Sequence, residues 1–366
     1  WSRQVALEAR GRLALQVGQS CHNPSGIRYV AFDYTSQEPE SVGGYTKFST
    51  PGKYRAALEA RSPALTDLSI THVASDGTWW TGIGLVNTTN SDKVLTLRFN
   101  DGRTRTVAVQ ARSHRSFLIR DLFGGAAQPA IASAVIENAS GIVGLELFGQ
   151  GDQLGGVSLT DQAATSLTYA HVHSDDTWWT GLVAYNPGAS PATLSITPYS
   201  ENGTALASQE RSLAAQGKFV GLVRDLGLPE DTAWLQVTAT QPVSGFELFG
   251  THDGKQLAGF TVVDAPRLQG TFPKLDQEGW TGLAFVNTGA SAVTVTLTAY
   301  TDDGTAVAEQ TLVVQGHAKT VGYPGEIFST DLTGATSIGF TSTGAVVGFQ
   351  LNGSEDGMLL DGLPVL

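Results

Sequence analysis

The chain has 366 residues, of which 41% are apolar and only 15% charged, and this length predicts about two to four domains. The net charge is −12, made up of +3 over residues 1–65 and −15 over the remainder. The acidic body excludes nucleic acid as an expected partner, because phosphate binding needs clustered Lys and Arg. Cys21 is the single cysteine, which excludes an internal disulfide. The sequence contains no run of about 18 apolar residues, so no membrane-spanning helix is predicted.

Residues 1–65 look like the second half of a unit that is repeated later in the chain. Gly43–Phe48 parallels Ser244–Phe249, but the strand and hairpin that should precede it are missing. Tyr54–Ala60 would also suit a helix, although its place in the repeat predicts a strand. We therefore expect an incomplete β unit whose open edge is filled by an upstream segment, another copy of the chain or a different protein. The start at Trp1, without Met or signal peptide, is interpreted as that of a processed or truncated product.

A Trp-Thr-Gly segment occurs three times. It spans Thr78–Asn87, returns as Thr177–Asn186, and returns again as Gly279–Asn287. The intervals are 99 residues from Trp79 to Trp178 and 101 residues from Trp179 to Trp280. Recurrence at a near-constant interval indicates a repeat architecture. We predict repeats at residues 66–166, 167–267 and 268–366, after the incomplete unit at 1–65.

Each repeat consists of short β segments separated by turn signals. Val94–Phe99 alternates strictly between apolar and polar residues, as a half-buried strand does. A tight hairpin is predicted after it and at the equivalent places, at Asp101-Gly102, Asn202-Gly203 and Asp303-Gly304. Seven or eight such strands per repeat predict an all-β chain with one antiparallel β-sandwich of about 100 residues per repeat.

The alternative is a seven-bladed β-propeller with two four-stranded blades per repeat. We favour the sandwich because the Trp-Thr-Gly strand occurs once in each repeat, whereas propeller blades normally repeat their motif.

The tryptophan pairs carry the strongest functional signal. Neighbouring residues of a strand point to opposite faces, and the third repeat keeps only Trp280. This pattern predicts that Trp80, Trp179 and Trp280 are core residues and that Trp79 and Trp178 face outward. An outward Trp beside Asp and Thr can stack on a sugar ring; packing against a neighbouring repeat is the alternative. The candidate ligand-binding residues are Trp79, Trp178, Asp76, Asp175, His72 and His171.

Catalytic, cofactor and metal sites are not predicted. No nucleophile elbow occurs, and Cys21 and His22 would point to opposite sides of a strand. His171 and His173 would share one face, followed by Asp175, but the first repeat has a single His at this place. A recurring metal site would repeat its ligands, so a polar strand end is the preferred interpretation.

Three polar residues recur inside apolar strands. Glu146, Glu247 and Gln350 lie by alternation on the face opposite Leu145 and its counterparts. We expect them to be exposed or hydrogen-bonded, since an unpaired buried carboxylate is costly. The replacement by Gln argues against a catalytic acid.

The whole pattern resembles immunoglobulin-like β-sandwich modules of large secreted bacterial proteins. The resemblance rests on the Trp-Thr-Gly strand, the Asp/Asn-Gly hairpin, the Gly-rich apolar strand and the closing Leu-Pro-Val-Leu, and it covers Leu68–Leu366 in three copies. It implies an extracytoplasmic spacer, adhesive or accessory role and brings no catalytic residues.

From these features we expect a non-catalytic structural or adhesive repeat array, extracellular or at the cell surface, that assembles through its N-terminal half unit. The expected partners are other protein chains, further domains of the same polypeptide, or polysaccharide. The alternative function is that of carbohydrate-binding modules.

Overall fold

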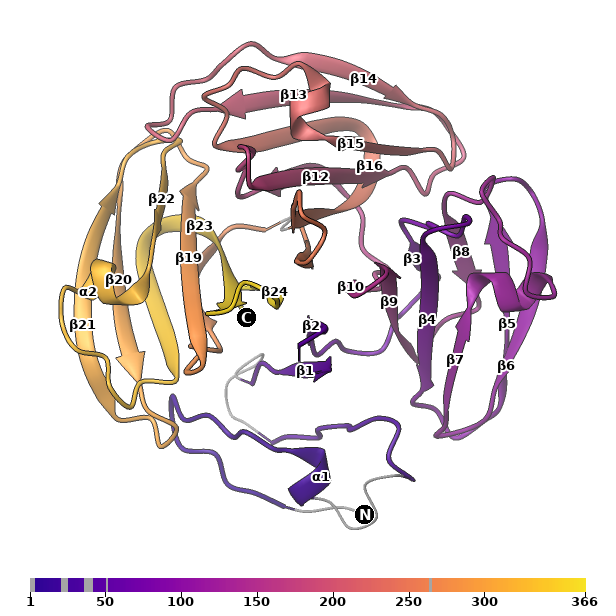
Figure 1. The fold of residues 1–366 in the computed structure, drawn as a ribbon, viewed down its shortest axis with the longest axis horizontal. Coiled ribbons are helices and arrows are strands. Elements are labelled where there is room, and N and C mark those ends of the chain that lie inside the picture. Colours follow the sequence, from indigo (N-terminus) through magenta and orange to yellow (C-terminus); the bar gives the residue numbers. More distant parts are fainter. Residues whose placement is uncertain (1–3, 21–25, 36–41, 51, 263–264) are drawn as a thin grey trace.

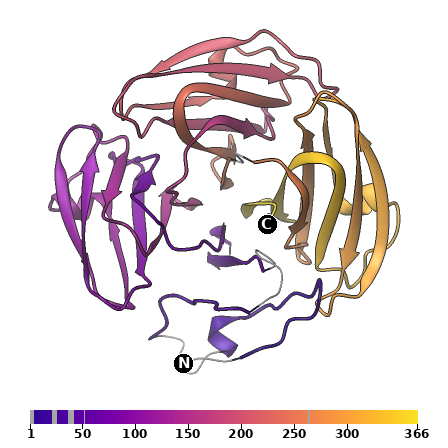
Figure 2. The same ribbon diagram turned by 180° about the vertical axis from the view of Figure 1, so that it is seen from behind.

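The computed structural model describes residues 4–20, 26–35, 42–50, 52–262 and 265–366. These residues form an all-β fold, which confirms the predicted class. Three similar units and an N-terminal segment surround a common centre, so that the chain occupies four positions of a ring (Figures 1 and 2). The N-terminal segment contains α1 (Val17–Ser20), β1 (Tyr45–Thr50) and β2 (Tyr54–Glu59).

The first unit consists of two four-stranded antiparallel sheets. Their strand orders are β3-β8-β5-β6 and β10-β9-β4-β7. Alternate residues of both sheets, including Leu95 and Leu97 from one and Ile83 and Leu85 from the other, meet in one apolar core. The elements of this unit are β3 (Leu68–Ile70), β4 (Trp80–Asn87), β5 (Lys93–Phe99), β6 (Thr104–Val109), β7 (His114–Leu118), η2 (Ile119–Phe123), β8 (Ala134–Glu137), β9 (Ile142–Gln150) and β10 (Gln153–Ser158).

The second unit repeats this order, but one long strand replaces β8 and β9. The first part of β16 pairs with β11 and β13, and its last part pairs with β12 and β17. In the first unit the same path is interrupted by a turn at Asn138 and Gly141, where φ is +64° and +79°. The elements of the second unit are β11 (Ala164–Tyr169), β12 (Trp178–Tyr185), β13 (Ala192–Tyr199), β14 (Gln209–Leu213), β15 (Lys218–Leu222), η3 (Val223–Leu226), β16 (Trp234–Thr251) and β17 (Leu257–Thr261).

The third unit has the same arrangement, with β23 as its long strand. Its elements are β18 (Arg267–Phe272), β19 (Gly279–Asn287), β20 (Val293–Tyr300), β21 (Ala306–Val314), β22 (Lys319–Gly322), α2 (Pro324–Phe328), β23 (Ser337–Ser354) and β24 (Leu360–Pro364).

Local sequence signals act as predicted at the turns. Gly102, Gly203 and Gly304 have φ between +83° and +88°, which explains the glycine in each hairpin. The Asn that ends each Trp-Thr-Gly strand is fully buried; Nδ2 of Asn87 donates to the carbonyls of Ser91, Val109 and Gln110 at 2.8–3.1 Å. Asn287 makes the three equivalent bonds and Asn186 makes two of them, so each anchors the loop that follows its strand.

Four β-hairpins meet at the centre of the ring. β2 contacts β10 and β24, and β17 contacts the same two strands, so the four strands form a closed cycle (Figure 1). Ala56, Ala57 and Leu58 of β2 are buried there. The first and third units of this chain therefore cover the apolar residues of β2, whereas the filling of the open edge by an upstream segment, another copy or a different protein stays a prediction.

The described residues contain five sheets rather than the seven four-stranded blades of the propeller alternative. Tyr54–Glu59 forms a strand, as its place in the repeat predicts. No helix in the described part of the chain is long and apolar enough to cross a membrane.

Candidate functional site

Asp76 and Asp175 shape the loops that lead into β4 and β12. Oδ1 of Asp76 accepts the backbone N–H groups of Thr78 and Trp79 at 2.6 and 2.7 Å, and Asp175 accepts the two equivalent groups at 2.7 Å. These hydrogen bonds, of which the one from the Trp N–H has the largest effect, hold the pKa of both carboxyl groups below its usual value. The two candidate carboxylates are thus engaged in turns.

Trp79 and Trp178 lie at the junctions between units. Trp79 is half-buried and packs against a cluster that joins Phe148 of the first unit to Phe246 of the second. Trp178 packs in the same way against the cluster between the second and third units. Both rings therefore contribute to the packing between neighbouring units, which was the alternative to stacking on a sugar ring.

The inner position predicted for Trp80, Trp179 and Trp280 is wrong. Trp80 shares a face of β4 with Gly82, whereas Ile83 and Leu85 on the opposite face enter the core. All three rings are half-buried, and each covers a glycine on the paired strand: Gly149, Gly250 or Gly353. The Trp that recurs in every repeat therefore shields a glycine outside the core.

The first junction contains a His–Lys contact between units. Nδ1 of His72 lies 2.8 Å from Nζ of Lys218, which comes from the second unit. The imidazole meets Phe148 and Phe246 edge to face, with ring centroids 5.7 and 5.9 Å apart. Glu146 is fully buried in the same region.

The second junction repeats this arrangement one unit later. Nδ1 of His171 lies 3.0 Å from Nζ of Lys319, which also donates to the carbonyl of Ala233 at 2.8 Å. His171 packs against Phe249 and Phe349, and Glu247 is fully buried, like Glu146.

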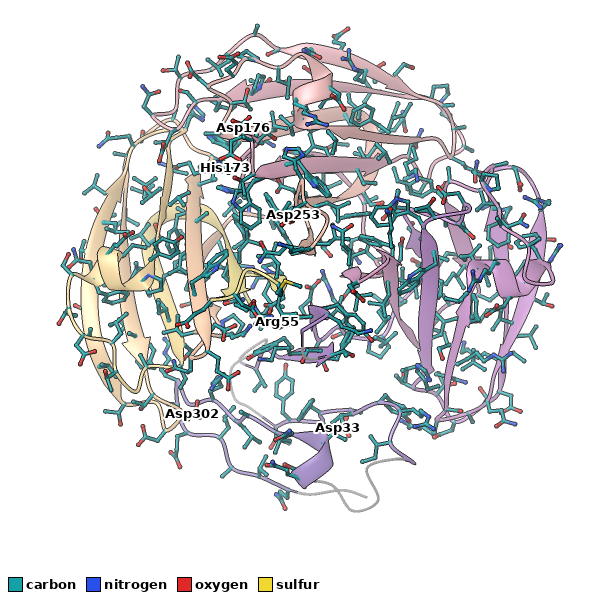
Figure 3. The ribbon with its side chains drawn as sticks, in the orientation of Figure 1. Asp33, Arg55, His173, Asp176, Asp253 and Asp302 are labelled. Atoms are coloured by element: carbon teal, nitrogen blue, oxygen red, sulfur yellow. The ribbon has the colours of Figure 1, made fainter. Side chains whose placement is uncertain are left out.

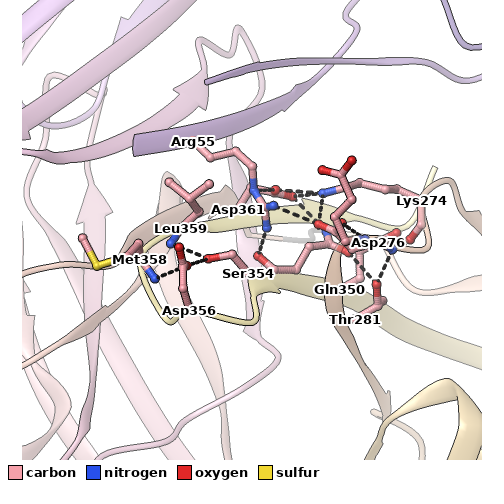
Figure 4. A network of polar contacts seen from close by, with 12 residues as sticks. Arg55, Lys274, Asp276, Thr281, Gln350, Ser354, Asp356, Met358, Leu359 and Asp361 are labelled. Carbon is pink, nitrogen blue, oxygen red and sulfur yellow. Dashed lines mark hydrogen bonds and ion pairs between the residues drawn. The ribbon is translucent and has the colours of Figure 1, made fainter. Parts of the chain in front are cut away.

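The third junction joins β2 to the third unit through a buried ionic network (Figure 4). Arg55 pairs with Asp361 and Asp276, at 2.5 and 2.9 Å, and Lys274 reaches the same two carboxylates at 2.9 and 3.1 Å. Nη2 of Arg55 also donates to the carbonyl of Asn352 at 2.6 Å. Two cations and two carboxylates balance each other, and Figure 3 places Arg55 towards the centre of the ring.

Burial changes the proton affinity of these groups. It raises the pKa of Glu146 to about 8 and, together with the nearby Lys218, lowers that of His72 to about 3. Burial also lowers the pKa of Lys218 and of Lys319 to about 8. The carboxyl group of Glu146 and the ammonium groups of Lys218 and Lys319 therefore have similar pKa values, whereas the pKa of the His72 imidazole lies far below them.

Glu146, Glu247 and Gln350 are fully buried, which excludes the exposed position considered for them. Gln350 is hydrogen-bonded: its Nε2 donates to the carbonyl of Lys274 at 2.6 Å and to Oδ1 of Asn352 at 3.0 Å. Each lies opposite a core residue on the Trp-Thr-Gly strand of its own unit, namely Ile83, Leu182 or Leu283, so all three side chains are on the core-facing side of the sheet.

Sequence reasoning did not identify Lys218, Lys319, Arg55 or Asp361 as parts of these clusters. The two lysines had a signal: each begins the strand that follows a Gly-containing turn, 101 residues apart. Arg55 had no such signal, because its partners are on β24 and on the loop before β19.

The other residues considered for catalysis or metal binding do not come together in a site within the described ranges. No group of three or more His, Cys, Asp or Glu residues that suits a metal ion is present in the described ranges. Cys21 and His22 lie outside the described residues. A pocket of about 110 Å³ opens between Arg61, Thr160, Ser244 and Thr261, below the range of about 300–1,000 Å³ that is usual for small-molecule sites.

Solved structures show weak similarity to this chain. A crystal structure of Thermotoga maritima 1070 matches 28% of this chain and 94% of its own, with 13% identity and a TM-score of 0.24. A calcium-binding mutant of Bacteroides uniformis beta-glucuronidase 2 matches 75% of this chain, which covers 34% of the enzyme, with 12% identity and a TM-score of 0.14. A tetra-tandem repeat from the extending region of a large adhesion protein matches 89% of this chain and 74% of its own, with 12% identity and a TM-score of 0.12. At such scores none of these similarities carries an argument.

No curated protein matches the chain in sequence. The model of a family of unknown function, DUF5719, matches residues 62–323, from the end of the N-terminal segment into the third unit. The chain belongs to this family, DUF5719.

Proposed function

We propose that the chain is a non-catalytic structural or adhesive repeat array of a secreted or cell-surface bacterial protein. The observation that carries this proposal is the use of its recurring ionisable residues at the junctions. His72 and His171 each contact a lysine of the next unit, and Arg55 joins the N-terminal hairpin to the third unit.

A catalytic use of these groups would need access for a substrate. Glu146 and Glu247 have no exposed surface, and Asp361 is 1% exposed. Buried ionic contacts of this kind restrict how neighbouring units fit together, because a lost partner leaves an unpaired charge. They therefore suit a rigid scaffold that holds its units in one arrangement.

Carbohydrate binding through Trp79 and Trp178 is the second candidate function. Both rings keep part of their surface exposed, which allows stacking on a sugar. Their packing against the junction clusters, and the turn bonds of Asp76 and Asp175, favour the scaffold.

One set of measurements on the purified chain separates these functions. We expect no retardation in gels that contain soluble glucan, mannan or galactan, and no hydrolysis of aryl glycosides. Retardation that is lost in a Trp79→Ala/Trp178→Ala double variant would establish sugar binding instead, and hydrolysis that is lost in Glu146→Gln would establish an enzyme. Immunoblots of the medium, surface and cytoplasmic fractions of the producing bacterium test the location.

A further inference from the structure

A polar side chain enters the core at the same place in each complete unit. It lies opposite a core residue of the Trp-Thr-Gly strand and has no exposed surface; the three side chains are Glu146, Glu247 and Gln350. Neither of the two carboxyl groups has a hydrogen-bond partner among the described residues. Buried polar groups without a partner are rare and costly, so the protonation of these carboxyl groups has to be considered.

The segment before each Trp-Thr-Gly strand is held in the same way in all three units. In the first unit the N–H groups of Val73 and Ala74 donate to the carbonyl of Ala132 at 2.7 Å and to Oγ1 of Thr81 at 2.8 Å. Equivalent bonds hold the other two segments. The residues that precede the two donors are therefore counterparts: His72, His171 and Lys274.

The third unit shows which chemistry suits this place. Nε2 of Gln350 donates to the carbonyl of Lys274 at 2.6 Å. A carboxyl group at the same place can donate to the carbonyl of His72 or His171 only when it is protonated. An ionised carboxylate would bring a second acceptor towards that carbonyl, with no proton between them. The glutamine therefore indicates that the place takes a neutral donor.

The lysines of the junctions do not supply a lasting partner for a carboxylate. Burial raises the pKa of Glu146 to about 8, against smaller effects of Lys218 and of the backbone of His72. Burial also raises the pKa of Glu247, against the effect of Lys319. Because burial lowers the pKa of both lysines to about 8, their ammonium groups lose the proton over the same pH range.

The other titratable groups around the two carboxyl groups are neutral. Burial lowers the pKa of His72 to about 3 and that of His171 well below its usual value. Near Glu247, burial raises the pKa of Tyr169, whose Oη donates to the carbonyl of Val183 at 2.8 Å. These three groups keep their protonation state between about pH 6.5 and 9, so the changes in this range belong to the carboxyl groups and the lysines.

We propose that Glu146 and Glu247 each hold a structural proton, which the carboxyl group donates to the backbone carbonyl of His72 or His171, and that loss of these protons loosens the first two junctions. The two histidines link the segments to the neighbouring units, because their rings contact Lys218 and Lys319. The proposal goes beyond the scaffold function, since it names what controls the contact between units.

The direction of the effect follows from the raised pKa. The bond of the carboxyl group is fully present below the unfolded pKa of 4.5 and is lost as the pH rises through the folded value, which is about 8 for Glu146. Gln350 has no such proton to lose, so the third junction stays closed over the same range. Alkaline conditions therefore loosen two of the three junctions.

Infrared spectroscopy of the full chain tests the protons directly. At about pH 6.5 exposed carboxyl groups are ionised, so the C=O stretching band of a protonated carboxyl group comes from buried ones. We expect this band in the wild type, about half of it in Glu146→Gln or Glu247→Gln, and none in the double variant. Glu309→Gln, at an exposed position, is the control and should leave the band unchanged.

Hydrogen exchange tests the loosening. The amides of Val73 and Ala74 should exchange equally in the wild type and in Glu146→Gln at about pH 6.5. At about pH 9, one pH unit above the pKa of Glu146, they should exchange about tenfold faster in the wild type. Comparison at one pH cancels the intrinsic exchange rate. The amides of Leu275 and Asp276 in the third unit are the internal control and should not differ.

Three outcomes would overturn the proposal: no protonated-carboxyl band in the wild type, a band that survives in the double variant, or equal exchange of the two proteins at about pH 9. Thermal unfolding checks that the variants are folded. Each of these results leaves the scaffold function in place, whereas retardation by polysaccharide would remove that function without affecting the two protons.

Discussion

Lys218 and His72 are 146 residues apart in sequence, yet Nζ of one lies 2.8 Å from Nδ1 of the other across the junction of the first two units. Lys319 and His171 repeat the contact at the next junction, at 3.0 Å. The same chemistry at two successive places indicates that the junctions, rather than one cleft, hold the distinctive polar groups of this chain.

Lys319→Met should lower the free energy of unfolding by about 1–3 kcal/mol, because the carbonyl of Ala233 and Nδ1 of His171 lose a buried donor. Urea unfolding measures this cost. Lys255→Met, at an exposed site, should change stability by less than about 0.5 kcal/mol. Equal effects of the two substitutions would contradict the role of the junction lysine.

The stability of the chain should fall as the pH rises from about 6.5 to 8. Burial raises the pKa of Glu146 from 4.5 to about 8, so its contribution is fully present below pH 4.5 and is lost as the pH rises through 8. His72, with its pKa lowered to about 3, acts in the opposite direction between pH 3 and 6.5, and Lys218, lowered to about 8, acts between pH 8 and 10.5. Glu247, whose pKa is also raised by burial, adds to the fall.

Between pH 6.5 and 8, Glu146 accounts for about 2 kcal/mol of the expected loss of stability, because each pH unit in this range costs about 1.36 kcal/mol. Unfolding by urea at pH 6.5 and 8 measures the slope, which should decrease in Glu146→Gln and nearly vanish in Glu146→Gln/Glu247→Gln. An unchanged slope in the double variant would show that other groups control it.

Arg55→Met should cost about 3–5 kcal/mol, because Asp276 and Asp361 lose one of their two buried cations. Hydrogen exchange should show lost protection in β1 and β2, which Arg55 ties to the third unit. Lys53→Met is the control: its contact with Asp152 is exposed and 3.8 Å long, and is worth about 0–1 kcal/mol. Retained protection of the hairpin in Arg55→Met would disprove the tie.

Gly250→Ala should destabilise the second unit by about 1–3 kcal/mol, since the new Cβ would lie 2.2 Å from the ring of Trp179. In a Trp179→Ala background the same substitution should cost much less. Gly325→Ala is the control, because nothing lies within 4 Å of a Cβ built there. Thermal unfolding of the four proteins completes the cycle, and additive costs would show that the ring and the glycine are independent.

The sequence by itself determined the features that depend on local chemistry. The period of about 100 residues, the all-β class and the glycine turns at Gly102, Gly203 and Gly304 follow from strand alternation and from backbone conformations that few residues adopt. The strand of Tyr54–Glu59 followed from its place in the repeat. The buried Asn87 was part of the predicted motif, although its anchoring bonds were not foreseen.

Only the tertiary structure decided which face of each strand lies in the core and which residues of other units contact the opposite face. Alternation shows that Trp79 and Trp80 point to opposite sides, but not which side is the core, and a one-residue difference in that assignment inverts every position of the strand. Lys218 reaches His72 because the first two units are adjacent in the ring. Such contacts join residues more than 100 positions apart and depend on how whole units pack, so no local pattern of residues encodes them.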